Sequence, residues 1–166
     1  MAQSDMFLKV TGQRTGEIRG ESTDRTYPDH IELVDWTWGM KTHTNVGGQA
    51  TGRRQLSELK VVKRADIAST ALMSVLSHNE TLTSVVLLVR KSGGASGGLA
   101  YFKVTLEKAR VSEYTVQSDV TPHGSPTLTE RLSFTFQRIT VDYTPQLGAG
   151  GGGGGTSFTD DVGPGA

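Results

Sequence analysis

The chain has 166 residues, with 17 lysines and arginines against 17 aspartates and glutamates, and it contains no cysteine. A formal net charge of zero leaves no field that would draw the chain to nucleic acid or to an anionic membrane. The lack of cysteine excludes disulfides, thiol catalysis and thiolate metal sites. No apolar run approaches the roughly 20 residues of a membrane span, and no signal peptide is recognisable. We therefore expect any export to proceed without a cleaved signal.

The first third of the sequence predicts two strands separated by a polar loop. Apolar and polar residues alternate over Asp5–Val10, which indicates a strand. Residues 11–29 are polar and interrupted by glycine, so they predict a long loop with room for a small hairpin. His30–Trp38 is the second predicted strand. Its Trp36 and Trp38 lie on the same side because strand side chains alternate with period two.

A polar, glycine-bearing segment, which we call the arm, follows the second strand over residues 39–54. It has no hydrophobic pattern on which to fold, and a connection this long inside a compact domain is usually functional or disordered. The two tryptophan rings that precede it would give it a wide apolar anchor. The pattern therefore predicts a rigid aromatic strand that presents a long arm to a partner.

The middle of the chain predicts a third strand and then one helix. Gln55–Lys63 has an apolar set that changes face, which suggests a bulge. Ile67–His78 carries apolar residues at the i, i+3, i+4 spacing of an amphipathic helix. Asp66 is placed to cap this helix and Asn79 to end it. We expect the apolar stripe of the helix to plug one opening of a β-structure.

The second half of the chain predicts further strands. Thr83–Arg90 is apolar on both faces, so it should be covered on both sides. A turn of glycine and serine over residues 91–98 joins it to Leu99–Glu107 in a hairpin. Ala109–Val116 is a further strand, and Arg131–Tyr143 is the longest one. The apolar residues of this longest strand change face midway, which places both sets in one core or lets the strand serve two sheets.

These elements predict a mainly β domain over residues 1–147, built as a small antiparallel barrel or sandwich with one helix. Residues 148–166 are rich in glycine, with six glycines in a row at positions 150–155. Because glycine loses more conformational freedom on ordering than any other residue, we expect a flexible tail there.

No residues in the sequence converge on a catalytic, cofactor or metal site. The histidines lack metal-ligand spacing, and the carboxylates before and within the second strand lack the order of a calcium loop. A polar loop running into an exposed strand face accounts for those carboxylates, and a solvated or interface face accounts for the basic stretch. We therefore expect no enzyme, cofactor or metal. The residues concerned are His30, His43, His78 and His123; Asp24, Asp29, Glu32 and Asp35; and Arg53, Arg54, Lys60, Lys63 and Arg64.

Several segments, taken together and in order, resemble the haemolysin-coregulated protein (Hcp) family, which supplies the tube protein of type VI secretion. The resemblance covers residues 5–147. It departs from the family in three places. Residues 13–19 look like an insertion, the arm differs in sequence, and the tail is rich in glycine. The segments that carry it are Met6–Val10, Gly20–Asp24, Ile31–Met40, Leu88–Gly94, Tyr101–Glu107, Val111–Tyr114, Leu132–Phe134 and Val141–Gln146.

The resemblance implies a small antiparallel two-sheet β-barrel with one flanking α-helix, similar to phage tail tube proteins. It also implies homohexameric rings that stack into a tube inside a contractile sheath. The partners it implies are a valine-glycine-repeat spike protein at the tip and small effector toxins in the lumen. Such a protein is cytoplasmic before firing and is then secreted without a signal peptide, outside the cell or into a target cell.

On this interpretation the arm is an assembly element at the ring or stacking interface. Two alternatives stay open: a phage-type tail tube protein, and a monomeric β-sandwich binding module. The second needs aromatic rings exposed at a groove, for which only Tyr27 and Tyr101 qualify. The predicted arm residues are Met40, Lys41, Thr42, His43, Thr44, Asn45, Val46, Gly47, Gly48 and Gln49, with Trp36, Trp38 and Gly39 as its root.

Overall fold

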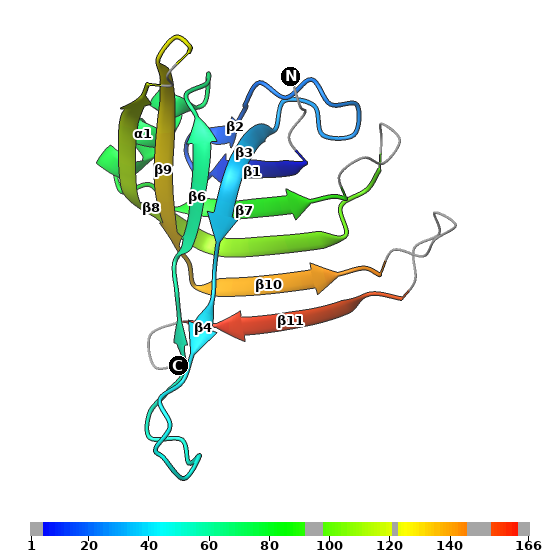
Figure 1. Cartoon of the computed structure of the whole chain (residues 1–166), viewed down its shortest axis with the longest axis vertical. Helices are drawn as coiled ribbons and strands as arrows, with labels where there is room; N and C mark the ends of the chain where they lie inside the picture. The colour runs from blue at the N-terminus through cyan, green and yellow to red at the C-terminus, as the bar shows by residue number, and fades with distance from the viewer. Residues whose placement is uncertain (1–4, 92–97, 121–122, 146–153, 163–166) are drawn as a thin grey trace.

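Figure 1 shows a computed structural model of the chain, which describes residues 5–91, 98–120, 123–145 and 154–162. In these ranges no helix is long and apolar enough to cross a membrane. The strands are β1 (Met6–Gly12), β2 (Gly16–Ile18), β3 (Ile31–Thr37), β4 (Met40–Lys41), β5 (Gln55–Leu56), β6 (Leu59–Arg64), β7 (Leu82–Val89), β8 (Phe102–Asp119), β9 (Thr127–Thr135), β10 (Arg138–Tyr143) and β11 (Thr156–Asp161), and the helix is α1 (Ser69–Ser77).

Six strands close into a barrel in the order β8–β7–β1–β3–β6–β9, with β9 pairing back onto β8. Closure depends on β8, whose first half pairs with β7 and β10 and whose second half pairs with β9. Lys108, at φ 50°, and a bulge between Val111 and Glu113 lie between the two halves. A bulge bends and twists a strand, so one strand can pass between two sheets. The expectation of two separate strands at 99–107 and 109–116 is therefore corrected to one bent strand.

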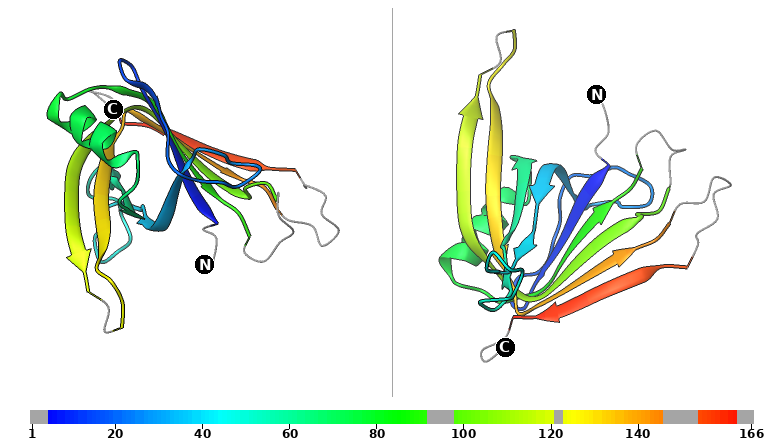
Figure 2. Two further views of the ribbon diagram at one scale, coloured as in Figure 1. Left: turned by 90° about the horizontal axis from the view of Figure 1, so that it is seen from above. Right: turned by 60° about the horizontal axis from the view of Figure 1, so that its bottom comes forward.

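Two further strands, β10 and β11, continue the sheet outward from the first half of β8, beyond the closed barrel (Figure 2). β10 pairs with β8, and β11 pairs with β10, which leaves β11 at the end of the sheet. The predicted strand Arg131–Tyr143 is thus two strands, β9 in the barrel and β10 in the extension. The expected single strand is thus corrected to two, with the change between Thr135 and Arg138, and residues from both still share one core.

β11 is a correction to the expected flexible tail. Residues 156–161 pair with all six residues of β10 in continuous antiparallel register. Their Thr-Ser-Phe-Thr lettering suits a strand, and pairing satisfies backbone groups that the edge of β10 would otherwise leave to water. Glycine content dominated the prediction for the tail and hid this short segment. Residues 146–153, which hold most of the glycine run, lie outside the described ranges.

Aliphatic side chains that alternate along the strands fill the barrel, as the period-two patterns predicted. The helix α1 contacts β8 and adds Leu72 and Val75 to this core. It is shorter than predicted and leaves Ile67 exposed. The Oδ1 atom of Asp66 accepts the backbone N–H of Ala68 at 3.0 Å, and Asn79, at φ 50°, follows the end of the helix. The strand residues of the core include Leu8, Val10, Ile31, Leu33, Leu59, Val61, Val85, Leu87, Val104, Leu106, Leu132 and Phe134.

A buried ion pair joins the start of the helix to the barrel. Lys63 on β6 and Glu130 on β9 bind each other, and both side chains are 0% exposed. The Nζ atom of Lys63 also lies 2.8 Å from Asp66, and Ser69 on α1 donates to Glu130 at 2.7 Å. The sequence interpretation had placed Lys63 in a solvated or interface face. The correction follows from its position on a barrel strand whose alternate side chains point inward.

Candidate functional site: a protruding arm

The root of the arm is the end of β3. The ring of Trp36 stacks on that of Phe102 with 5.7 Å between centroids. Trp38 is also partly buried, and both tryptophans pack against the core, as expected from their spacing. Gly39 exchanges two hydrogen bonds of 2.9 Å with Ser57, one from each backbone N–H. The aromatic strand therefore holds the point at which the arm leaves the barrel.

Beyond this root the arm is a two-stranded ribbon. β4 and β5 pair through Met40↔Leu56 and Lys41↔Gln55, and a bridge joins Thr44 to Ala50 further out. The tip is a turn in which the side chain of Asn45 accepts the N–H of Gln49 at 2.9 Å. In this turn Gly48 has φ 82°, a conformation that side-chain-bearing residues rarely adopt. The arm is thus locally ordered by its own hydrogen bonds.

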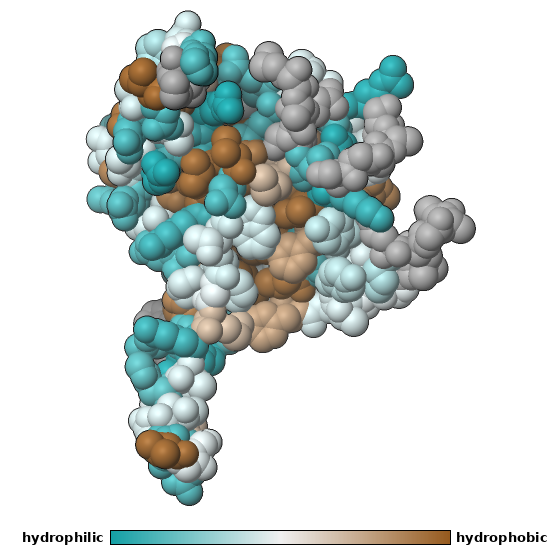
Figure 3. Space-filling model, viewed as in Figure 1, coloured by the Kyte–Doolittle hydropathy of each residue, from teal (hydrophilic) through white to brown (hydrophobic). Residues whose placement is uncertain are grey.

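The arm stands clear of the barrel (Figures 1 and 3). Every residue from Gly39 to Gln55 is exposed, including the apolar side chains of Met40 and Val46. A hollow at its base is lined by residues 39–41 and 55–57. The ribbon therefore buries little of its apolar surface on the described part of its own chain.

One contact ties the arm back to the barrel extension, and sequence reasoning missed it. Arg54 donates from Nε and Nη2 to the two carboxylate oxygens of Asp160 on β11, at 2.7 and 2.6 Å. The same Nη2 donates to the backbone carbonyl of Asp161 at 2.9 Å. We call this group, Arg54 with Asp160 and the Asp161 carbonyl, the Arg54 clamp. No sequence signal links the two segments, because they lie 106 positions apart.

Two arginines, Arg54 and Arg138, bind the two carboxylates of β11 and shift their pKa values. The hydrogen bond from Arg54 holds the pKa of Asp160 below its ordinary value, and Asp160 raises the pKa of Arg54 in turn. Arg138 on β10 lies 2.7 Å from Asp161 and lowers the pKa of that carboxyl in the same way. Arg54 and Arg138 thus extend the charged range of both β11 carboxylates to lower pH.

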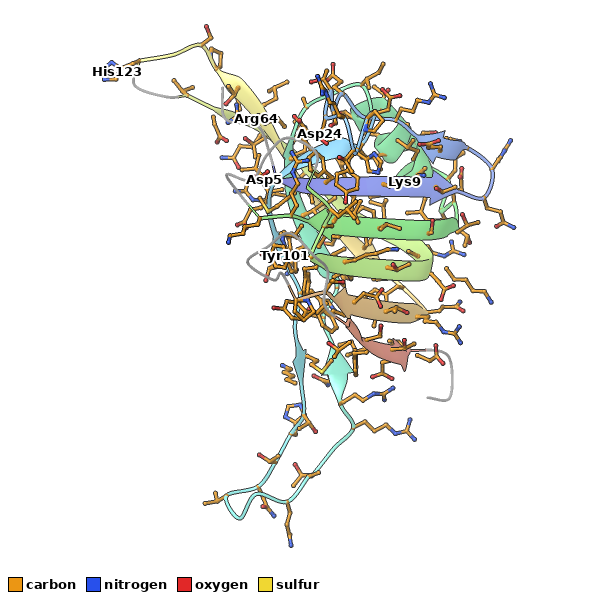
Figure 4. The ribbon with its side chains drawn as sticks, turned by 90° about the vertical axis from the view of Figure 1, so that its right-hand side faces the viewer. Asp5, Lys9, Asp24, Arg64, Tyr101 and His123 are labelled. Atoms are coloured by element: carbon orange, nitrogen blue, oxygen red, sulfur yellow. The ribbon has the colours of Figure 1, made fainter. Side chains whose placement is uncertain are left out.

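The other residues considered as chemical candidates are dispersed. Asp24, expected in a polar loop, is instead buried against Arg90, with 2.5 Å between Nη2 and Oδ2. That hydrogen bond lowers the pKa of Asp24. Arg90 also binds Asp5 at 3.1 Å, which brings the loop to the start of β1 (Figure 4). Asp24 therefore has a structural partner.

Nothing in the described ranges brings three or more histidines or carboxylates together in a way that could hold a metal ion. Glu32 lies on an exposed part of β3, and its pKa is raised first by desolvation and then by nearby carboxylates. His123 lies at the far end of the β8–β9 hairpin (Figure 4). These groups lie on different elements.

The two aromatic residues that a binding groove would require are engaged within the chain. The ring of Tyr27 packs on Phe7 at 5.1 Å, and its hydroxyl accepts the N–H of Ala100 at 2.8 Å. Tyr101 meets Tyr143 edge to face at 6.4 Å. This arrangement gives the binding-module alternative no support.

The comparisons with known proteins agree with this architecture. Residues 7–143 match the family described as "Type VI secretion system effector, Hcp". The chain belongs to the Hcp family of type VI secretion tube proteins. It is 30% identical over 154 residues to the Pseudomonas aeruginosa protein named hcp1, covering 91% of this chain and 90% of that protein. A second protein of that organism, named "Major exported protein", is 25% identical over 168 residues, covering 93% of each.

Solved structures of Hcp proteins confirm the fold. A crystal structure of a type VI secretion system effector from Yersinia pestis is 25% identical, with a TM-score of 0.72. The alignment covers 95% of this chain and all of the other chain. The family match includes the barrel strands, α1, β10 and the arm, whereas β11 lies beyond its last residue. The Arg54 clamp therefore joins a family element to a strand outside the matched range.

Proposed function

We propose that this chain is the tube subunit of a type VI secretion system, and that it forms homohexameric rings that stack into the expelled inner tube. The observation that carries the proposal is the arm. Residues 40–49 leave the barrel at Trp36, Trp38 and Gly39, and their apolar side chains, Met40 and Val46, are exposed. In a ring, the arm reaches an adjacent copy of the same chain.

The fold supplies further features that suit self-assembly. β2 and β11 each pair on one side only among the described strands, so their other edges offer backbone donors and acceptors to a neighbour. A head-to-tail contact with a suitable rotation closes a ring rather than growing a filament. A chain of zero formal charge places little repulsion between its copies.

The remaining partners follow from family membership and form part of the same proposal. A contractile sheath surrounds the tube, a valine-glycine-repeat spike protein lies at its tip, and small effector toxins ride in the lumen. The chain waits in the cytoplasm and leaves the cell when the sheath contracts, without a signal peptide.

The first test removes the arm. Deleting residues 42–51 shortens the ribbon beyond the β4–β5 pair, so the barrel should keep its circular dichroism spectrum and melting temperature. Size-exclusion chromatography with light scattering should show the full chain as a hexamer and the deletion as smaller species, or as rings that no longer stack under the electron microscope.

The matched control keeps the length of the arm but replaces residues 42–51 with glycine and serine. It should fail like the deletion if the side chains make the contact. Stacked tubes formed by both variants would rule out the arm as the assembly element. A full chain that stays monomeric at tens of micromolar would count against the ring itself.

A further inference from the structure

We propose that Arg54 is the positioning residue of the arm, and that β11 is the surface against which the arm is aimed. The idea rests on the proposed assembly role, because it concerns how the arm is held ready for a neighbouring copy. In this arrangement the Arg54 clamp sets the direction of the arm relative to the barrel before any second copy is present.

The chemistry of the clamp favours a fixed geometry. Two parallel N–H donors meet both oxygens of Asp160, and a third hydrogen bond reaches the main chain at Asp161. A guanidinium is planar, so a two-point contact with a carboxylate restricts rotation as well as distance. The side chains of Arg54 and Asp160 are 42% and 18% exposed, so the pair is accessible yet shielded on the β11 side.

The location of the clamp gives it leverage. Arg54 immediately precedes β5, which pairs with β4 through two residue pairs next to the Gly39–Ser57 hydrogen bonds. Four positions separate Arg54 from Ala50 at the outer bridge, which is roughly 13 Å at the rise of an extended strand, and the tip turn lies beyond it. A swing of about 10° at the root would therefore move the bridge by about 2 Å, and the tip by more.

β11 is itself held on the barrel, so the clamp fixes the arm relative to the barrel. It pairs with β10 along its full length, and Arg138 binds Asp161 while also lying 3.7 Å from Glu107 on β8. The side chain of Ser157 donates to Asp142 on β10. The orientation of the arm thus depends on a strand that follows the glycine run.

A plain surface ion pair is the competing explanation. Exposed pairs commonly contribute little to stability, and the β4–β5 pairing could hold the arm without help. The two explanations agree that losing Arg54 leaves the barrel folded. They differ on whether the arm then moves, so the decisive measurement is the mobility of its tip.

The chain has no cysteine, so one spin label can be placed at the tip through Val46→Cys. Continuous-wave electron paramagnetic resonance then reports tip mobility in the full-length chain, whether or not rings form. In this background Arg54→Ala and Asp160→Ala should each narrow the lines and shorten the rotational correlation time. Lys103→Ala, which removes an exposed cation of β8 outside the arm and the clamp, is the matched control and should leave the spectrum unchanged.

Charge exchange separates positioning from general damage. Arg54→Asp alone should mobilise the tip, and combining it with Asp160→Arg should restore much of the slow motion. Electron microscopy of the same proteins should show fewer stacked rings for Arg54→Ala and recovery in the exchanged pair.

Spectra that are identical with and without Arg54, or no recovery in the exchanged pair, would overturn the clamp whatever the rings do. A mobile tip in the Arg54→Ala chain, together with tubes as long as those of the parent, would retain the clamp but remove its role in assembly. Failure of the parent chain to form rings would refute the proposed function, while the spectra would still decide whether the clamp exists.

Discussion

The α1 side of the barrel and the base of the arm each hold a cation against a carboxylate, but in opposite settings. Lys63 and Glu130 are fully buried. Lys63 also contacts Asp66, and Glu130 also accepts a hydrogen bond from Ser69. Arg54 and Asp160 lie at the surface, where water competes for both partners. The same chemistry therefore serves the fold at one place and the direction of an exposed element at the other.

The difference shows what each pair contributes when it is lost. Removing one member of a buried pair leaves an uncompensated charge away from water, which is strongly destabilising. An exposed charge that loses its partner is simply hydrated, so the fold is hardly affected. Substitutions on the α1 side should accordingly lower the free energy of unfolding strongly, whereas substitutions at the arm base should redirect the arm and leave the barrel intact.

The largest effect is expected from Glu130→Ala. It leaves the buried ammonium of Lys63 with Asp66 alone and removes the acceptor of Ser69, so we expect a cost of about 3 kcal/mol in the free energy of unfolding. Urea denaturation of this variant should be compared with that of Glu107→Ala, whose carboxylate pairs at the surface with Arg138. Equal midpoints for the two variants would show that burial does not separate the two kinds of pair.

A smaller effect is expected from Trp36→Ala and Trp38→Ala, at the boundary between barrel and arm. Each ring packs on the core but is only partly buried, so we expect a loss of about 2–3 kcal/mol, below the cost of deleting a fully buried ring. Denaturant melts measure the loss. A neutral substitution would mean that the ring adds nothing to the anchoring of the arm.

The smallest of the three effects is expected from Asp24→Asn, and it depends on pH. Arg90 lowers the pKa of the Asp24 carboxyl in the folded chain. A group with a depressed folded pKa stabilises the fold above its unfolded pKa, and this contribution is lost as the pH falls from about 5 through the folded pKa. Losing the charge of Asp24 in its hydrogen bond with Arg90 should lower the free energy of unfolding by about 1–2 kcal/mol at neutral pH.

Unfolding free energies measured from pH 7 to pH 3 check this sign. The gap between the parent chain and Asp24→Asn should be widest at neutral pH and should close toward acid. A gap that stays constant over this range would show that Asp24 acts through packing and not through its charge.

The local sequence pattern was sufficient to predict many elements of this protein. Alternating residues predicted β1, an apolar run predicted β7, and the change of face along residues 131–143 left two alternatives, one core or two sheets. Asn79 was correctly placed at the end of the helix. The arm was located by its lack of a hydrophobic pattern, and its root by the spacing of Trp36 and Trp38, because these signals depend only on neighbours in the chain.

The tertiary structure decided what depends on distant partners. β8 became one bent strand because β7 and β10 pair with its first half and β9 pairs with its second half. Lys63 is buried because Glu130, 67 positions away, lies on the adjacent strand. Arg54 meets Asp160 only because β11 pairs with β10, and a pairing across 106 residues leaves no periodic trace in either segment. The sequence therefore determined that an arm exists, while the neighbours chosen by the folded sheet determined what holds it.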